Sequence, residues 1–259
     1  MEHDLRLERD GNVLIATIDR ADKMNALGMQ LHQDLEEAWA EAKSDRSVRA
    51  IVITASGERA FCTGMDLREL VARGEHRESP DNVHDAMKIT PLNCGVWLPT
   101  VVAVNGVCAA AGLHFVADAD VVIASTNAWF VDTHVSVGQV SAIEPITLVP
   151  RIGLGNALRL ALLGRAGRID VQEALRISLI DEIVAPERLV ERAVELAQAM
   201  AAGSPAAAEA SKRAIRGVLE RPMADAMQYG WELLRAHRDH PDAMEGPLAF
   251  SEKRPPKWG

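Results

Sequence analysis

Five short runs of apolar residues lie before residue 186. They are VLIATI (13–18), AIVITA (50–55), TVVAVNG (100–106), DVVIAS (120–125) and LIDEIV (179–184). Each run is continuously apolar and does not alternate with polar residues, which is typical of strands covered on both faces. The pattern therefore predicts a buried sheet with mainly parallel pairing.

Segments with the apolar periodicity of a helix lie between some of these runs. Residues at steps of three and four form one apolar helix face, namely Leu27, Leu31, Leu35, Trp39 and Ala42. Further along, Asp170 followed by Glu173 is typical of a capping box that opens a helix at VQEALRIS. Strands that alternate with helices favour an α/β fold.

The pattern becomes purely helical after about residue 186. Helices are predicted for 186–202, 204–220 and 222–238, the second with Ser204 as N-cap and Pro205 at the first helical position. We therefore expect two parts: an α/β body over residues 1–190 and a helical region over residues 191–259.

Composition narrows the possible partners. The chain has 259 residues and a formal net charge of −9, which argues against nucleic acid because that partner needs a basic surface. Its three cysteines have no C-x-x-C spacing, so disulfides and zinc are not expected. The apolar runs are shorter than a membrane span and the charged N-terminus lacks a signal-peptide pattern. We expect a cytoplasmic protein without a membrane partner.

Two segments share a pattern that suits the binding of an anionic oxygen. RAFCTGMDLREL (59–70) and VNGVCAAAGLHF (104–115) each join a strand end, small residues and a predicted helix start, at Asp66 and near Ala111. Free backbone N–H groups at such helix starts can form an oxyanion hole when two of them converge. The alternative is that the small residues only allow tight packing.

Longer stretches of the chain carry a family resemblance. The blocks are IDRADKMNAL (18–27), FCTGMDL (61–67), PTVVAVNGVCAAAGLHFVADADVVIAS (99–125), RIDVQEALRISLIDEIV (168–184) and EGPLAFSEKRPPKW (245–258). Together they resemble the enoyl-CoA hydratase/isomerase (crotonase) family over essentially the whole chain. The resemblance implies a crotonase-type spiral of β-β-α turns, followed by a C-terminal helical trimerisation region. It also implies a homotrimer or a dimer of trimers.

The same resemblance implies a ligand and the residues that hold it. The ligand is an acyl-CoA thioester, with coenzyme A as part of the substrate and no tightly bound cofactor. Backbone N–H groups of Met65 and Ala111 would hold the thioester oxygen; alanine replaces a frequent glycine at the second position and is acceptable if its φ is negative. The implied substrate-binding residues are Lys23, Ala26, Gly64, Asp66, Leu67, Arg68, Gly112, Phe250 and Lys253. The last two belong to a block that often serves a neighbouring subunit, and any of the charges could instead be a solvated surface group.

Two histidines break the family pattern. Family hydratases use two glutamates, which fall on His114 and His134 in this chain. Histidine is partly protonated near neutral pH, so acid–base chemistry can survive the replacement. Two neighbouring imidazoles should depress each other's protonation and split into one acid and one base.

Three functions follow from this replacement. The first is an enoyl-CoA hydratase or isomerase with a His/His pair. The second is hydrolysis of a C–C bond in a β-diketone or β-keto thioester, helped by Asp132 or by Glu144, which stands where the family usually has glycine. The third is an acyl-CoA binder without catalysis, in which the histidines are ordinary core residues. A metal site is not expected, because the histidines have no third ligand at a recognisable spacing.

Several other residues allow more than one interpretation. Trp97 and Trp129 could line an acyl pocket or belong to the core, and Cys62 and Cys108 are interpreted as small hydrophobic residues. The polar segment 73–85, with His76 and His84, is predicted to be a loop near the site.

Overall fold

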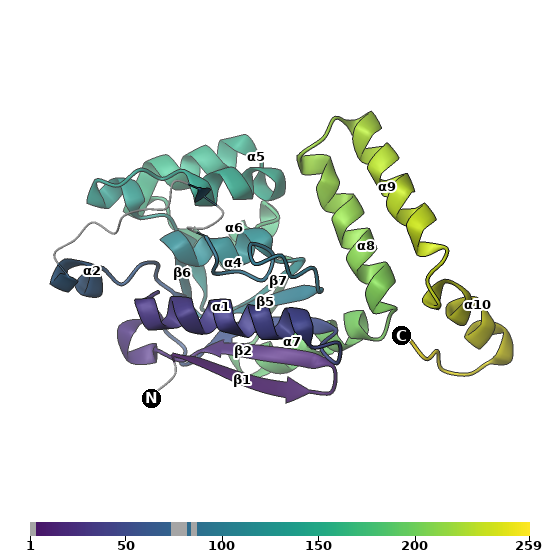
Figure 1. Ribbon diagram of the computed structural model, residues 1–259. Helices are drawn as coiled ribbons and strands as arrows, with labels where there is room; N and C mark the ends of the chain where they lie inside the picture. Colours follow the sequence, from purple (N-terminus) through teal and green to yellow (C-terminus); the bar gives the residue numbers. More distant parts are fainter. Residues whose placement is uncertain (1–3, 74–81, 84–86) are drawn as a thin grey trace.

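The computed structural model describes residues 4–73, 82–83 and 87–259 (Figure 1). His76 and His84, together with most of the predicted loop 73–85, lie outside the described residues.

A six-stranded sheet contains all five predicted strands. Its order is β1-β2-β3-β5-β7-β10, with β1 antiparallel to β2 and every other pair parallel. The strands are β1 (Leu5–Asp10), β2 (Val13–Ile18), β3 (Ala50–Ala55), β5 (Thr100–Val104), β7 (Val121–Ser125) and β10 (Glu182–Val184). β1 was not predicted, because only its first residue, Leu5, is buried and the rest of this edge strand is exposed.

A second, smaller sheet has the order β4-β6-β8-β9. Its strands are β4 (Ala60–Cys62), β6 (Val107–Ala109), β8 (Trp129–Val131) and β9 (Ile169–Asp170), too short to stand out as apolar runs. The chain passes from the large sheet to the small one at β3–β4, β5–β6 and β7–β8, so the body is a spiral of β-β-α turns. The parallel strands β4, β6 and β8 therefore end at the same edge.

The large sheet is covered on both faces, as its continuous apolar strands predict. In β3, Ile51 and Ile53 join the core that contains α1 (Met29–Ser44), while Val52 joins the core that contains α7 (Leu189–Ala201). The predicted apolar face of α1 is buried through Leu31, Leu35 and Trp39.

Three short helices, one long helix and several 3-10 turns connect the described strands and helices. The helices are α2 (Leu67–Arg73), α4 (Leu113–Asp118), α5 (Ile143–Leu163) and α6 (Val171–Arg176). The 3-10 turns are η1 (Ala21–Lys23), η2 (Ala110–Gly112), η3 (His134–Val137), η4 (Gly164–Ala166), η5 (Pro186–Arg188) and η6 (Gly217–Leu219). The cap predicted at Asp170 is confirmed, since its side chain accepts a hydrogen bond of 2.9 Å from the N–H of Glu173.

Helix α5 is longer and more apolar than the sequence pattern predicted. Among the described residues, the stretch Ile143–Ala166 is long and apolar enough to cross a membrane, by length and composition alone. Core helices also pass this test, and Glu144, Arg151 and Arg159 interrupt the apolar residues of the stretch, so each uninterrupted apolar run is still shorter than a span. The helix is interrupted at Gly153 (φ 76°), and Leu148 and Leu160 on its inner side belong to the main core.

The C-terminal part is helical, and no strand follows β10 in the described chain. It contains α8 (Pro205–Arg216), α9 (Met223–His237) and α10 (Asp242–Glu252). Ser204 caps α8 as predicted, accepting from the N–H of Ala207 at 3.1 Å. Figure 1 shows α8 and α9 as an antiparallel pair beside the α/β body, with α10 further out. Because α7 packs on the large sheet, the division at residue 190 stays a prediction.

Candidate active site

The three parallel strands of the small sheet each lead directly into one segment of the site. β4 is followed by Thr63-Gly64-Met65, β6 by Ala110-Ala111, and β8 by Asp132. In open α/β folds the carboxyl ends of parallel strands are the usual location of ligands. This shared edge explains how segments far apart in sequence come together.

Two strained turns present the two candidate N–H groups. Gly64 has φ +91° and Ala110 has φ +48°, and each immediately precedes a candidate donor, Met65 or Ala111. A Cβ added at Gly64 would lie 3.4 Å from the nitrogen of Ala111, so the two turns are in direct contact. Ala111 itself has no positive φ, and the strained alanine is the preceding residue. A left-handed alanine costs roughly 1–2 kcal/mol, which the surrounding packing must offset.

The backbone around Met65 directs its N–H away from the sheet. Leu27 donates to the oxygen of Gly64 at 2.8 Å, and Asp66 donates to the oxygen of Leu27 at 3.0 Å. Within the described part of the chain Met65 N–H has no backbone acceptor, and Ala111 N–H lies in the first turn of η2, where N–H groups have no partner within the helix. Two adjacent free donors are what an oxyanion hole requires.

Gly112 has a packing role between these segments. A Cβ at this position would lie 2.6 Å from the carbonyl oxygen of Cys62. The glycine therefore allows the strand end at Cys62 to approach the start of α4.

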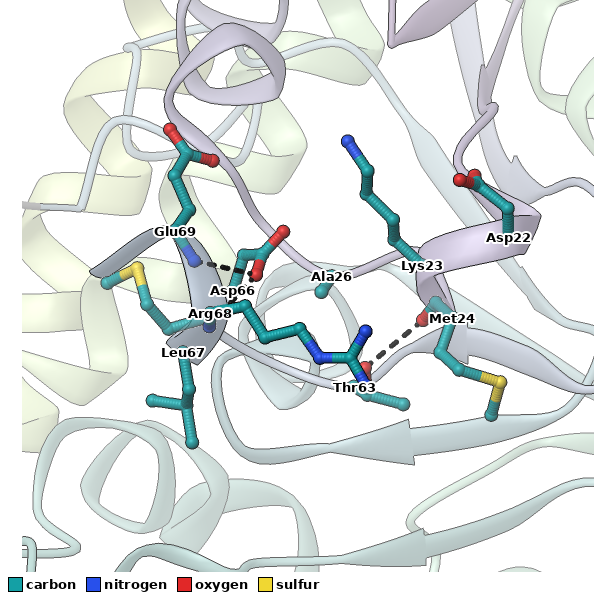
Figure 2. A pocket seen from close by; sticks show the side chains of 10 residues that line it. Asp22, Lys23, Met24, Ala26, Thr63, Asp66, Leu67, Arg68 and Glu69 are labelled. Atoms are coloured by element: carbon teal, nitrogen blue, oxygen red, sulfur yellow. Dashed lines mark hydrogen bonds between the residues drawn. The ribbon is translucent and has the colours of Figure 1, made fainter. Parts of the chain in front are cut away.

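A cavity of about 680 Å³ lies beside Met65 (Figure 2). Of the residues expected to bind the substrate, Lys23, Ala26, Asp66, Leu67 and Arg68 line it, whereas Gly64 and Gly112 do not. Figure 2 shows Lys23 coming from the η1 turn and Arg68 from α2, on either side of Ala26. Two different elements of secondary structure therefore each place one cation in the lining of the cavity.

Both carboxylate oxygens of Asp66 contact other residues of the protein. Its Oδ1 accepts from the N–H groups of Arg68 and Glu69, both at 3.2 Å, and so caps α2. Its Oδ2 lies 3.3 Å from Nη2 of Arg20, a buried arginine that also binds the carbonyl oxygen of Ala26. Sequence reasoning missed Arg20, which lies two residues after β2, because only the fold brings Asp66 near it.

Phe250 and Lys253 lie away from this cavity in the same chain. They belong to the end of α10, which Figure 1 places at the opposite side of the molecule from α2. The Phe250 side chain is 88% exposed.

A second group of side chains surrounds Glu144, which is buried in the first turn of α5. Its Oε1 lies 3.2 Å from Nε2 of His114 and 3.8 Å from Nε2 of His134. His114 is 2% exposed and comes from α4, while His134 opens η3. The two predicted histidines are thus brought together, with a carboxylate between them.

The expected mutual repulsion of the imidazoles was wrong for His134. The hydrogen bond to Asp132 raises the pKa of His134 against the effect of burial, and the charges of Glu144 and Asp132 raise it further. The carboxylate of Glu144 lies between the two imidazole rings, so each ring is next to an opposite charge and not only next to the other ring. The imidazolium form of His134 is therefore more stable than that of a free histidine.

Asp132 and Ser141 hold His134 from behind. Oδ1 of Asp132 lies 2.7 Å from Nδ1 of His134, and Oδ2 accepts from the hydroxyl of Ser141 at 2.5 Å. A carboxylate only accepts, so Nδ1 carries a proton and Nε2 faces Glu144. Burial would raise the pKa of Asp132, but these hydrogen bonds and the N–H of His134 outweigh it and keep the pKa low. Sequence reasoning missed Ser141.

Glu144 is ionised in this environment. Burial alone would raise its pKa, but the hydrogen bond and charge of His114, with the charge of His134, lower the pKa below its usual value. The cluster therefore combines an ionised carboxylate with a neighbouring imidazolium, which is a base beside an acid.

The remaining candidates lie outside this chemistry. Trp129 stacks with Arg168 at 4.2 Å and Trp97 with Arg213 at 4.5 Å, measured from the guanidinium carbon to the ring centroid. Burial raises the pKa of the Cys62 thiol to about 12 and that of Cys108 well above its usual value, consistent with small hydrophobic residues. Within the described ranges, no three His, Cys, Asp or Glu side chains are arranged to hold a metal ion.

Known proteins resemble this chain over nearly its whole length. The family model described as enoyl-CoA hydratase/isomerase matches residues 8–259. The chain is 32% identical to the (E)-benzylidenesuccinyl-CoA hydratase of Thauera aromatica, over 97% of each chain. It is also 32% identical to the carnitinyl-CoA dehydratase of Proteus mirabilis, over 100% of this chain and 99% of the other. A solved enoyl-CoA hydratase/isomerase from Mycobacterium paratuberculosis superposes with a TM-score of 0.89 at 35% identity, covering 99% of this chain and 98% of the other.

Proposed function

The chain belongs to the enoyl-CoA hydratase/isomerase family, and we propose that it adds water to, or removes water from, the α,β-bond of an acyl-CoA thioester. The names of two relatives, a hydratase and a dehydratase, support this class of reaction. The observation that carries the proposal is the carboxylate of Glu144 between Nε2 of His114 and Nε2 of His134. Coenzyme A enters as part of the substrate, and we propose no tightly bound cofactor.

The thioester carbonyl oxygen is proposed to bind the N–H groups of Met65 and Ala111. Negative charge develops on this oxygen when the bond between Cα and Cβ is polarised. Each preorganised donor of this kind contributes about 3 to 4 kcal/mol to the stability of the enolate. The adjacent turns at Gly64 and Ala110 support the assignment, because they present both donors from one place.

The cavity beside Met65 is proposed to hold the phosphate-bearing part of coenzyme A. Lys23 and Arg68 supply positive charge, and the exposed Leu67 supplies apolar surface. Phosphate groups pair well with both cations.

In the hydration direction, Glu144 acts as the base. Its carboxylate takes a proton from water while the water oxygen bonds to Cβ. The electrons of the double bond move onto the thioester oxygen as an enolate. The imidazolium of His134 then gives its Nε2 proton to Cα, and one molecule of water has been added.

Oε1 of Glu144 and Nε2 of His134 are 3.8 Å apart, too far for a hydrogen bond, so we propose that the proton returns through one bridging water molecule. The proton taken from water passes from Glu144 to His134, which restores the starting state of both groups. His114 holds Glu144 in place from the buried side. The expected pair of two histidines thus becomes a proposed set of three residues.

A second candidate is hydrolysis of a C–C bond in a β-keto thioester. The hydrogen bond of 2.7 Å between Asp132 and His134 favours it, because a carboxylate that orients an imidazole is also used to activate water. Water would add to the β-carbonyl carbon, the bond between Cα and Cβ would break, and Cα would take a proton. The products are a carboxylic acid and a shorter acyl-CoA.

An assay in heavy-oxygen water separates these reactions. Purified protein is incubated with a panel of enoyl-CoA and β-ketoacyl-CoA thioesters, and products are identified by mass spectrometry. Hydration places the label in a β-hydroxyl group, whereas C–C hydrolysis places it in the released acid. Binding of coenzyme A thioesters without any product would contradict both reactions and favour a binding protein.

The assembly is proposed to be a homotrimer or a dimer of trimers in the cytoplasm. Exposed apolar residues on the C-terminal helices support an assembly, among them Ile215, Leu219, Met223, Met227, Leu234 and Phe250. In such an assembly Phe250 and Lys253 would serve the cavity of a neighbouring subunit. Analytical ultracentrifugation tests the assembly, and a monomer would contradict it.

A further inference from the structure

The helix that carries His114 is only one and a half turns long and must hold two proposed functional groups. α4 spans Leu113–Asp118, with Ala111 just before its start. A helix this short is unstable by itself, so its position depends on contacts at its ends. Its last carbonyl groups have no partners within the helix.

Two arginines bind these carbonyl groups. Nη2 of Arg216, from α8, donates to the oxygen of Asp118 at 2.5 Å. Nη2 of Arg151, from α5, donates to the oxygen of Ala119 at 2.9 Å. Cations at the C-terminal end of a helix also interact favourably with its dipole.

Further contacts fix the turn that follows α4. Lys212, one turn before Arg216 on α8, donates to Oδ2 of Asp120 at 2.7 Å and to the oxygen of Leu98 at 2.9 Å. Lys212 is 9% exposed, so its charge depends on this pairing. The end of α4 is therefore joined to a helix almost a hundred residues away in sequence.

The side chain at the end of α4 is held as well. Asp118 accepts from the hydroxyl of Thr90 at 2.6 Å and from the amide of Asn93 at 3.1 Å. Asp118 follows His114 by four residues, so both lie on the same face of α4. A displacement at Asp118 would therefore move His114 relative to Glu144.

We propose that Arg216 is a positioning residue, through which the C-terminal helices hold α4 in register for the proposed reaction. The inference rests on that reaction, because it assigns Arg216 no contact with substrate. Arg216 fixes the C-terminal end of α4 at Asp118. The N-terminal end of α4 then keeps Ala111 beside Met65. A change on α8 is thereby transmitted to the acid–base cluster.

In the single chain, Arg216 can be reached from solvent. It lines a groove of about 730 Å³, together with Asp118, Arg151 and Leu219. A small planar cation can therefore enter the space that a shortened side chain leaves.

The first experiment compares Arg216→Ala with Arg213→Ala. Arg213 lies on the same helix, but it pairs with Glu209 at the surface and stacks with Trp97. For Arg216→Ala we expect kcat to fall roughly 10- to 100-fold with KM changed less than about threefold, as for a misplaced catalytic group. For Arg213→Ala we expect both constants to stay near those of the unaltered protein.

The second experiment is chemical rescue. Low millimolar guanidinium should restore part of the kcat of Arg216→Ala, whereas potassium chloride at the same ionic strength should not. Arg216→Lys should retain more activity than Arg216→Ala. A general loss of folding would not respond to guanidinium in this way.

Hydrogen exchange gives a test that does not depend on activity. Amides of residues 113–119 should exchange faster in Arg216→Ala than in Arg213→Ala, without substrate. Unchanged exchange together with unchanged kcat would overturn the role of Arg216. The unaltered protein could turn over no thioester while α4 exchanges faster in Arg216→Ala. That result would contradict the proposed function but would support the role of Arg216 in holding α4.

Discussion

The two ends of the proposed site, here called the thioester end and the acid–base end after their proposed roles, are built in different ways. At the thioester end, the proposed groups are backbone N–H groups of Met65 and Ala111, presented by two turns in contact. At the acid–base end they are side chains, and His114, His134 and Glu144 come from α4, η3 and α5.

Whether an end of the site uses backbone groups or side chains determines how easily substitutions can change its chemistry. A backbone donor survives most substitutions, so the thioester end tolerates alanine where the family often has glycine. A side-chain cluster changes its reaction with each replacement. We therefore expect the specific chemistry of this protein to depend on the acid–base end, and five experiments follow from this comparison.

The largest effect is expected for Glu144→Gln. The amide cannot take a proton from water, so kcat should fall about 10²- to 10⁴-fold while thioester binding changes little. Stopped-flow turnover and calorimetric binding measure the two quantities. Glu220→Gln, at an exposed position, is the control. Full activity of Glu144→Gln would remove Glu144 from the reaction.

A somewhat smaller effect is expected for Ala111→Pro at the thioester end. Proline has no N–H, and loss of one oxyanion donor typically lowers kcat about 10²- to 10³-fold. Ala110→Gly is the matched control, because it relieves the positive φ and keeps the N–H of Ala111. Circular dichroism checks the fold of both variants. Equal turnover in the two would contradict the oxyanion assignment.

Asp132→Asn should have a moderate effect with a defined pH signature. The hydrogen bond to Asp132 raises the pKa of His134, so its removal lowers that pKa. If His134 acts as the acid, kcat falls as pH rises through this pKa, and in the variant the fall should begin at lower pH. We expect kcat at neutral pH to drop roughly 10-fold. A descending limb at unchanged pH would show that another group is the acid.

The hydrogen bond between Asp132 and His134 also predicts how the free energy of unfolding depends on pH. A raised folded pKa means that His134 stabilises the fold fully below about pH 6.5, its unfolded value, and that this contribution is lost as pH rises through the folded value. His134→Gln should remove this slope. Urea unfolding at pH 6 and pH 9 measures it.

The smallest effect is expected for Gly28→Ala, which lies next to Glu69 of the cavity lining. An added Cβ would lie 2.5 Å from Oε2 of Glu69 and 2.8 Å from Nη1 of Arg20, although the backbone at Gly28 (φ −92°) accepts alanine. Displacement of α2 should raise KM for the thioester about 3- to 10-fold and leave kcat near normal. Adding Glu69→Ala should remove the closer of the two clashes and leave the clash with Arg20, so KM should fall part of the way back. A KM that stays high in the double variant would contradict this explanation.

The sequence predicted the thioester end better than the acid–base end, for a physical reason. Strand ends and small residues are local signals, and the turns at Gly64 and Ala110 follow directly from them. The five long strands and the caps at Asp170 and Ser204 are local in the same sense. The position of Glu144 between two rings depends instead on how α5 packs against α4, and no local pattern encodes that distance. Arg20 and Ser141 were missed for the same reason, since each acts on a partner brought near by the fold.

The short strand β8 has a practical consequence for protein engineering. Asp132, His134, Ser141 and Glu144 all follow it within one continuous stretch, residues 132–144, which enters the site from one strand end and leaves through one helix. Most of the proposed acid–base set can therefore be moved as one segment. Replacing residues 132–144 of a relative with this stretch, together with histidine at the position of His114, would transfer all of these side chains in two changes.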